Sequence, residues 1–267
     1  MARLGWIGLG RIGTGMALRL RKAGHDLHVY DVRPEQMAPL VDVGAHAAKS
    51  PADVAARCEA VFLSAIDTDS VAAIVFGPNG IASASGAGKL VIDHTTIHPE
   101  RAREIAARLR AEAGMGWIDA PVSGTPGTLS VFAGGEAAHV ERARPWLAAY
   151  AANITHVGPL GAGQLAKSCN QAVVTATLAI WSEVLAYAQR LGLDPATLMK
   201  AISGGGADSA VRTYFERELL AGRLPPETVR NMSKDLEIVR DMAGAHPMPM
   251  NATVAAVFKR AFGNSPI

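Results

Sequence analysis

The beginning of the chain contains the feature that most restricts its fold. A short apolar segment, residues 4–7, leads directly into a glycine-rich segment, and residues 16–22 then have a helical pattern. A second apolar segment, residues 26–30, ends at Asp31. This order of strand, glycine turn, helix, strand and acid is that of a parallel crossover unit and predicts an α/β fold. The glycine-rich segment reads Gly8-Leu9-Gly10-Arg11-Ile12-Gly13.

Each glycine of this segment has its own physical use. Gly8 permits a tight turn, Gly10 lets the backbone approach a pyrophosphate, and Gly13 allows close packing of helix on strand. The pyrophosphate is expected at the helix N-terminus, where N–H groups and the helix dipole attract an anion. Because the segment lies between a strand and a helix, with Asp31 18 residues after its last glycine, it predicts a dinucleotide site. All six residues, 8–13, are candidate cofactor contacts.

The residues after the second strand bear on which dinucleotide binds. A carboxylate at Asp31 can accept hydrogen bonds from ribose hydroxyls and repels a 2′-phosphate. Arg33, two residues later, can instead receive that phosphate. We give the acid more weight and predict NAD, with NADP as the alternative. Asp31, Val32 and Arg33 are the candidate residues.

Strands and helices continue to alternate as far as residue 158. Ligands of such sheets bind beyond the carboxyl ends of the strands. Those ends carry Ala65 and Ile66, Thr96 and its neighbour Thr95, and residues 121–124, so we expect them in one crevice. Strands are predicted over 60–66, 89–93, 117–121 and 129–133, and helices over 37–43, 51–57, 71–76, 99–113 and 141–150.

The second half of the chain has no predicted strand. Helices are predicted over 195–202, 211–220, 228–244 and 253–262. The expected architecture is therefore an N-terminal Rossmann-type domain, residues 1–160, and an all-helical C-terminal domain, residues 193–267. A long interdomain helix, residues 161–192, joins them.

That joining helix has no proline or glycine from residue 164 to residue 191, which at 1.5 Å per residue gives a length of roughly 42 Å. Small and apolar residues occupy every face, which predicts burial all round, and its Ser, Thr, Asn and Gln residues argue against a membrane span. Lys167 in its first turn has two interpretations. It is either an end-of-helix lysine that reaches water or a desolvated lysine whose lowered pKa suits proton transfer.

Composition excludes several classes of protein. A net charge of +2 gives no indication of a nucleic-acid or membrane-surface partner. Two cysteines, Cys58 and Cys169, form no disulfide framework, and no Cys/His cluster has zinc-site spacing, so no metal is predicted. The N-terminus has no signal-peptide pattern, and together with the cysteine usage this favours the cytoplasm.

Several separated motifs resemble those of the β-hydroxyacid dehydrogenase family, which includes 3-hydroxyisobutyrate dehydrogenases and tartronate semialdehyde reductases. The glycine segment from Gly8 to Ala17 is similar to its signature, and Asp119-Ala120-Pro121-Val122-Ser123-Gly124 to its substrate-binding segment. The run from Gly161-Ala162-Gly163-Gln164 to Lys167-Ser168-Cys169-Asn170-Gln171 resembles the start of its catalytic helix. Lys234-Asp235-Leu236 is similar to its C-terminal lysine motif, and Ser203 to Ser209 to its glycine loop.

The resemblance implies a nicotinamide-dependent oxidoreductase acting on a small β-hydroxy acid or its semialdehyde. In that reading Lys167 is the general acid/base, Asn170 orients the substrate, and Ser123 and Gly124 hold its carboxylate. Thr96 contacts both cofactor and substrate, and Lys234 lies near the nicotinamide. Ala65 and Ile66 line the path of the cofactor.

Two departures from the family pattern concern residues near the implied substrate site. Only Thr125 and Pro126 separate Gly124 from Gly127, which makes this loop a few residues shorter than usual. His94 stands where the family has Met or a small polar residue, and it either fills a strand end or contacts the substrate. The particular acid therefore stays open among 3-hydroxyisobutyrate, glycerate or tartronate semialdehyde, serine, threonate and 4-hydroxybutyrate.

Two other functions are alternatives to this one. Imine reductases share the fold and the glycine motif, but they generally lack a lysine at the Lys167 position. A non-catalytic nucleotide-binding relative would usually have lost that lysine or gained an appended domain. Because the apolar helices of the C-terminal half need cover, we also expect a homodimer or homotetramer.

Overall fold

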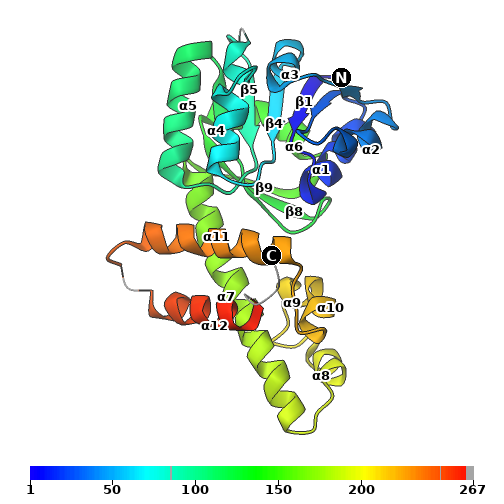
Figure 1. Cartoon of the computed structure of the whole chain (residues 1–267), viewed down its shortest axis with the longest axis vertical. Helices are drawn as coiled ribbons and strands as arrows, with labels where there is room; N and C mark the ends of the chain where they lie inside the picture. The colour runs from blue at the N-terminus through cyan, green and yellow to red at the C-terminus, as the bar shows by residue number, and fades with distance from the viewer. Residues whose placement is uncertain (85, 247, 263–267) are drawn as a thin grey trace. The chain divides into compact units, whose positions relative to one another are not determined.

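The computed structural model describes residues 1–84, 86–246 and 248–262 (Figure 1). The chain divides into two compact units, Met1–Lys167 and Ser168–Ile267. Residues 263–267, which end the predicted C-terminal domain, lie outside the described part. The finer division into two domains and a joining helix stays a prediction.

The first unit contains a nine-stranded sheet. Six strands pair in parallel, and the strand order reverses between β1 and β4, which is where open α/β sheets bind their ligands. This is the predicted Rossmann-type arrangement. The parallel strands, in spatial order, are β3 (His46–Ala47), β2 (Asp26–Tyr30), β1 (Arg3–Ile7), β4 (Ala60–Leu63), β5 (Leu90–Asp93) and β6 (Gly116–Asp119).

Three further strands extend the sheet beyond β6. β8 (Leu129–Gly135) runs antiparallel to β6 and to β7 (Val122–Ser123), and β9 (Ala151–Gly158) pairs with β8 in parallel. The sequence does not predict β3, β7 and β9. Two of them have only two residues, and the residues of β9 are half-buried or exposed, so no apolar run marks it.

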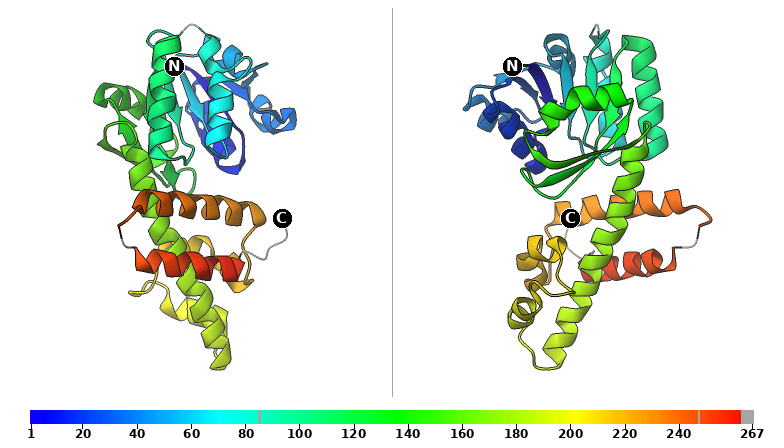
Figure 2. Two further views of the ribbon diagram at one scale, coloured as in Figure 1. Left: turned by 60° about the vertical axis from the view of Figure 1, so that its left-hand side comes forward. Right: turned by 180° about the vertical axis from the view of Figure 1, so that it is seen from behind.

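Helices cover both faces of the sheet (Figure 1; Figure 2). α1 (Arg11–Lys22), α2 (Ala38–Val41) and α6 (Ala137–Leu147) share one core cluster with the sheet. α3 (Pro51–Arg57), α4 (Thr68–Phe76) and α5 (Pro99–Ala113) share the other. Because both faces are covered, the central strands β4 and β5 are buried along their whole length rather than at alternate residues. Two short 3₁₀ turns, Pro34–Met37 and Ile81–Ser83, complete the unit.

The described residues of the second unit are all-helical apart from turns and loops, as predicted. Its helices surround a core cluster that includes Leu178, Trp181 and Phe258. The predicted helix over residues 211–220 is interrupted at Phe215, which faces that core. The helices are α8 (Pro195–Ile202), α9 (Ala210–Tyr214), α10 (Glu216–Leu220), α11 (Pro226–Ala243) and α12 (Pro249–Phe262).

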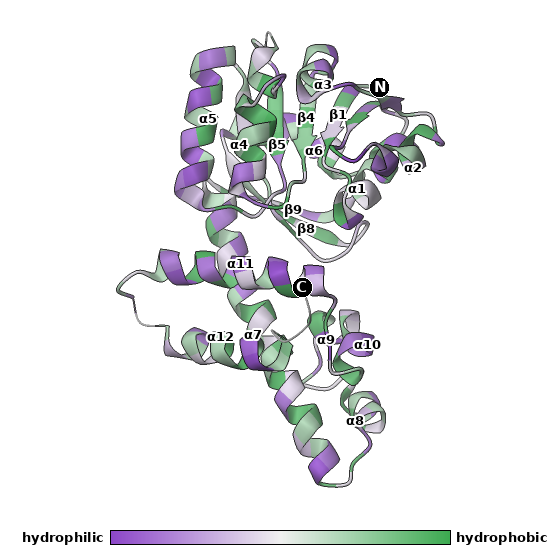
Figure 3. Cartoon of the chain, in the orientation of Figure 1, coloured by the Kyte–Doolittle hydropathy of each residue, from purple (hydrophilic) through white to green (hydrophobic). Residues whose placement is uncertain are grey.

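α7 (Ala162–Arg190) begins in the first unit and continues into the second. The prediction that it is buried on every face is wrong for the single chain: Val173, Ile180 and Tyr187 are 66%, 56% and 61% exposed. Figure 3 shows apolar residues along much of this helix. Within the described ranges, α7 alone has the length and hydropathy of a membrane span, and 44% of its most apolar window is buried. Core helices of folded domains meet the same criteria.

Candidate functional site

The glycine turn between β1 and α1 has the geometry that its sequence predicts. Gly8 has φ +91°, and a Cβ there would lie 2.3 Å from the carbonyl oxygen of Ser64 at the end of β4. A Cβ at Gly13 would lie 2.3 Å from the oxygen of Gly8, so helix and turn pack too closely for any side chain. A Cβ at Gly10 would have no atom within 4 Å. The predicted tight turn and close packing are confirmed, and the approach at Gly10 is open.

The N-terminus of α1 has no side-chain cap. Gly10 is its N-cap residue, and the first turn contains no acidic residue. The first N–H groups of any helix have no carbonyl partner within the helix, and the dipole adds positive potential there. This end of α1 is therefore suited to an anion.

Asp31 is held against the glycine turn. Its Oδ2 accepts a hydrogen bond from the Leu9 N–H at 2.7 Å, and its Oδ1 accepts one from the Arg33 N–H at 2.9 Å. The Arg33 guanidinium lies beside the same carboxylate, with Nε 3.6 Å from Oδ1. Asp31 is buried, whereas Val32 is 79% exposed. Two of the three residues predicted for cofactor choice thus form one ion pair at the end of β2.

The ends of β4 and β5 are joined directly. The Ala65 N–H donates to Thr95 Oγ1 at 3.0 Å, and the Thr95 N–H donates to the Asp93 carboxylate at 2.9 Å. Thr95 is buried, Thr96 is half-buried, and Ile66 is exposed. The structure therefore brings the predicted residues Ala65 and Thr96 to adjacent loops at one edge of the sheet.

The first turn of α7 is fastened to the same edge. The carboxylate of Asp119, at the end of β6, accepts from the Gly161 N–H at 2.8 Å and the Gln164 N–H at 2.9 Å. Burial raises the pKa of Asp119 to about 6, although the backbone N–H groups around it favour the ionised form. The side chain of Gln164 donates to the Thr95 carbonyl oxygen at 2.8 Å and accepts from the Ile97 N–H at 3.1 Å.

Lys167 lies one turn further along α7 and is 8% exposed. Its Nζ donates to the carbonyl oxygen of Val122 at 2.8 Å. Val122 immediately precedes Ser123 and Gly124, and Gly124 has φ +103°. The amine of Lys167 and the predicted carboxylate-binding segment are therefore neighbours.

The short loop after Gly124 forms a turn and packs against α1. The Thr128 N–H donates to the Thr125 carbonyl oxygen at 2.9 Å, which makes a turn. Pro126 lies against Gly15 of α1, where a Cβ would come within 2.8 Å of Pro126 Cγ. The loop next to Ser123 is thus packed against the helix that follows the glycine turn.

Two predicted site residues belong to the second unit. Asn170 follows Lys167 by three residues on α7, and its side chain donates to Gln171 Oε1 at 3.0 Å. Lys234 is on α11, with Nζ 3.4 Å from Oδ1 of Asp235. Gln171 Nε2 donates to Oδ2 of the same Asp235 at 2.7 Å. Asn170 and Lys234 are therefore linked through Gln171 and Asp235.

His94 is a core residue. It is 5% exposed and packs beside the stacked pair of Trp6 and Phe62, with ring centroids 5.6 Å and 5.9 Å away. Nδ1 bonds the Ala120 carbonyl oxygen at 2.6 Å, and Nε2 bonds the Tyr150 hydroxyl at 2.8 Å. Because a carbonyl only accepts, Nδ1 carries the hydrogen. Burial lowers the pKa of His94 to about 4, so the ring is neutral at pH 7 and fills the strand end.

Three residues of this edge were given no role by sequence reasoning: Asp119, Thr95 and Gln164. Asp119 and Gln164 stand within the quoted motifs, but their contacts join residues 42 or more positions apart in the chain. A polar residue among apolar ones at the start of a helix was the available signal for Gln164. In the part of the chain that the structure describes, no group of three His, Cys, Asp or Glu side chains is placed to hold a metal ion.

Comparison with known proteins gives consistent matches along the chain. Residues 3–158 match the family model described as the NAD binding domain of 6-phosphogluconate dehydrogenase. Residues 161–265 match the one described as NAD-binding of NADP-dependent 3-hydroxyisobutyrate dehydrogenase.

Individual proteins match over nearly their whole length. The 2-hydroxy-3-oxopropionate reductase of Escherichia coli is 34% identical, over 98% of this chain and 92% of that protein. The 3-hydroxyisobutyrate dehydrogenase of Pseudomonas aeruginosa is 35% identical, over 98% and 91%. The crystal structure of 3-hydroxyisobutyrate dehydrogenase from Salmonella typhimurium is 29% identical and superposes with a TM-score of 0.89, covering 97% of this chain and 94% of that one.

Proposed function

We propose that this chain, which belongs to the β-hydroxyacid dehydrogenase family, uses Lys167 as the general acid/base of a hydride transfer. As a member of that family it is an oxidoreductase that uses a nicotinamide cofactor and acts on a CH–OH group. The substrate that we propose is a small β-hydroxy acid or its semialdehyde. The relatives named above, a reductase of 2-hydroxy-3-oxopropionate and a dehydrogenase of 3-hydroxyisobutyrate, support this class.

The observation that carries the proposal for Lys167 is its hydrogen bond to the Val122 carbonyl. Oxidising an alcohol by hydride transfer requires a base that removes the hydroxyl proton, and reducing a carbonyl requires the same group as an acid. A largely buried amine beside Ser123 and Gly124 is suited to that role, since those two residues offer a hydroxyl and a backbone N–H to a substrate carboxylate. Thr96, Asn170 and Lys234 complete the proposed substrate site.

The cofactor supplies the hydride acceptor or donor, and we propose residues 8–13, 31–33, 65, 66, 96 and 234 as its contacts. Gly10 and the uncapped first turn of α1 support a pyrophosphate there. We propose NAD rather than NADP because the Asp31 carboxylate repels a 2′-phosphate, and because Arg33 is already paired with that carboxylate.

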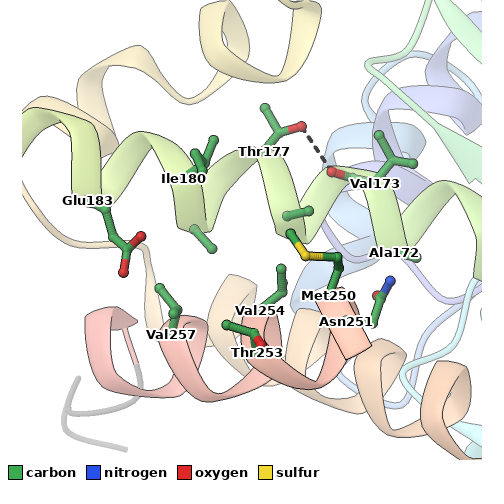
Figure 4. Close-up of a pocket in the computed structure, with 12 residues that line it drawn as sticks. Ala172, Val173, Thr177, Ile180, Glu183, Met250, Asn251, Thr253, Val254 and Val257 are labelled. Carbon is green, nitrogen blue, oxygen red and sulfur yellow. Dashed lines mark hydrogen bonds between the residues drawn. The ribbon is translucent and has the colours of Figure 1, made fainter. Parts of the chain in front are cut away.

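We propose that the enzyme works as a homo-oligomer through the exposed side of α7. Val173, Ile180 and Tyr187 recur at seven-residue spacing, as do Thr177, Val184 and Leu191, which is the spacing of a helix seam that can pair with a copy of itself. Val173, Thr177 and Ile180 of this seam also line an apolar groove of about 480 Å³ between α7 and α12. Figure 4 shows Val173, Ile180, Met250 and Val254 among the side chains that line it.

Sedimentation tests the oligomer. Ile180→Arg is expected to shift the chain to monomer, while Val43→Arg, at an exposed valine of the first unit, leaves the assembly intact. A wild-type monomer would contradict the proposal.

The reaction is tested by following nicotinamide absorbance with a panel of small hydroxy acids and semialdehydes, each with NAD and NADP. Lys167→Ala is expected to lower kcat for the accepted substrate by about 10³-fold, within the range for loss of a general acid/base. Lys200→Ala, at an exposed lysine of α8, is the matched control and keeps wild-type turnover. Normal turnover of Lys167→Ala would remove Lys167 from the mechanism, and turnover of imines alone would identify an imine reductase.

A further inference from the structure

The buried side-chain amide of Gln164 lies close to two of the proposed site residues, Thr96 and Lys167. Gln164, in the first turn of α7, is 1% exposed, and its side chain makes two hydrogen bonds to the loop that follows β5. Its Nε2 donates to the carbonyl oxygen of Thr95, and its Oε1 accepts from the N–H of Ile97. These two backbone groups stand on either side of Thr96. The amide of Gln164 therefore fixes the peptide segment that presents Thr96.

The helix that carries Gln164 is itself fixed at its start. One oxygen of the Asp119 carboxylate accepts from Gly161 and the other from Gln164. A Cβ at Gly163 would lie 2.5 Å from the Asp119 carbonyl oxygen and 2.3 Å from that of Phe132, so this turn lies in direct contact with the ends of the sheet. Lys167 follows Gln164 by three residues and therefore lies on the same side of the helix.

We infer that Gln164 is a positioning residue for hydride transfer: it sets the placement of Thr96 relative to the amine of Lys167. The inference rests on the proposed function of Lys167 and extends it to a residue that does not contact the substrate. The role needs an amide or its equivalent, because the site presents one acceptor, the Thr95 carbonyl, and one donor, the Ile97 N–H. Loss of either bond leaves a buried backbone group without a partner.

Replacing the Gln164 amide with a carboxyl gives a selective test. In Gln164→Glu, the neutral carboxylic acid can donate through O–H and accept through C=O, which reproduces the pattern of the amide. The ionised carboxylate can only accept and is repelled by the Thr95 carbonyl. We therefore expect the kcat of Gln164→Glu, relative to wild type at the same pH, to rise at least tenfold as the pH falls from 8 to 5.5.

Gln164→Leu has neither bond at any pH, so its kcat is expected to stay about 10- to 100-fold below wild type at all pH values, within the loss that a displacement of about 1 Å causes. Three neighbouring groups also titrate or carry charge: Asp119, Asp93 and Lys167. All three are common to wild type and both variants, so a pH dependence that they cause by themselves also appears in the ratio for the uncharged Gln164→Leu, with which the Gln164→Glu ratio is compared. Gln189→Leu, the same change at an exposed position of α7, is the matched control with wild-type kcat.

The outcomes separate this inference from the proposed function. Wild-type turnover that depends on Lys167, together with unchanged kcat in Gln164→Leu, overturns the positioning role only. A pH-independent ratio for Gln164→Glu also overturns it, because a merely structural loss does not return on protonation. If wild type accepts no substrate, hydrogen exchange decides: faster exchange of the Ile97 amide in Gln164→Leu supports the restraint on Thr96, and unchanged exchange contradicts it.

Discussion

Two helices of the first unit begin in glycine-rich turns at the same edge of the sheet, and their N-termini are satisfied in opposite ways. At α1 the N-cap is Gly10, no side chain caps the turn, and no acid lies in the first turn. At α7 the buried carboxylate of Asp119 accepts from Gly161 and Gln164. The N-terminus of α1 is therefore available to an anionic ligand, whereas that of α7 is capped by a carboxylate of the chain itself.

The glycines of these two turns differ in the same way, in the space around them. Gly10 opens onto space, whereas a Cβ at Gly163 would meet backbone at 2.3 Å. A glycine next to open space serves approach by a ligand, and a glycine in contact with backbone serves packing. Composition alone does not separate these uses, so each turn must be tested by substitution.

The largest effect is expected from filling the packed positions. Gly13→Ala and Gly163→Ala each place a Cβ 2.3 Å from a backbone oxygen, so the turn must move. We expect a loss of about 3 kcal/mol in the free energy of unfolding, at the upper end of the usual overpacking cost, measured by urea denaturation. Gly10→Ala, in open space, is the control and loses less than about 1 kcal/mol, the difference between glycine and alanine at an N-cap. Equal stability of all three variants would show that the two kinds of glycine are not distinct.

A smaller effect is expected from giving α1 the kind of cap that α7 has. Gly10 has an extended backbone conformation that suits an N-cap side chain. Gly10→Asp is expected to stabilise the chain by a few tenths of a kcal/mol through capping, because glycine is itself a fair N-cap residue. The same carboxylate should weaken NAD binding at least tenfold, because it occupies and repels the proposed pyrophosphate position. Calorimetric titration measures the binding, Gly10→Ser supplies a cap without charge, and unchanged affinity in Gly10→Asp would place the pyrophosphate elsewhere.

The smallest net effect is expected in the pH dependence of stability, because two buried groups, His94 and Asp119, contribute with opposite signs. Burial lowers the pKa of His94 from 6.5 to about 4, so the unfolded chain binds the extra proton between those values, and stability falls as the pH falls through that window. Burial raises the pKa of Asp119 from 3.8 to about 6, so the folded chain binds the extra proton, and stability falls as the pH rises from 3.8 to about 6. At 1.36 kcal/mol per pKa unit, each contributes on the order of 3 kcal/mol.

Variants separate these two contributions. Relative to wild type, Asp119→Asn is expected to make stability rise more steeply with pH between 4 and 6, and His94→Gln to make it rise less steeply or fall. Urea midpoints at several pH values measure both slopes. Slopes that change in the same direction would contradict the assignment of opposite signs.

The sequence predicts best where local chemistry decides the outcome. α5 is predicted to the residue because Pro99 starts it and Gly114, with φ +68°, ends it. α6 is displaced, since its start at Ala137 has no side-chain cap and the predicted end at Tyr150 is a core residue. Local pattern also predicts the turn at Gly8 and Gly13, where the constraint lies within a few residues.

A local sequence pattern does not predict contacts between segments that are distant in the chain. The bonds from Asp119 to Gly161 and from Gln164 to Thr95 span 42 and 69 residues, and nothing in either segment alone specifies the pairing. The burial of α7 was mispredicted for a related reason. Its composition indicates that apolar cover is needed on all faces, but composition does not tell whether the same chain or a second one supplies it.

The glycine turn also has an optical consequence. The indole N–H of Trp6 donates to the carbonyl oxygen of Gly8 at 3.1 Å, and the ring stacks on Phe62 with centroids 5.1 Å apart. Trp6 is fully buried, so its emission depends on the protein groups around it, including this carbonyl, and not on solvent. Any ligand that shifts the Gly8 peptide alters the hydrogen bond to the fluorophore beneath it. Trp6 fluorescence can therefore report ligand binding at the glycine turn without an added dye.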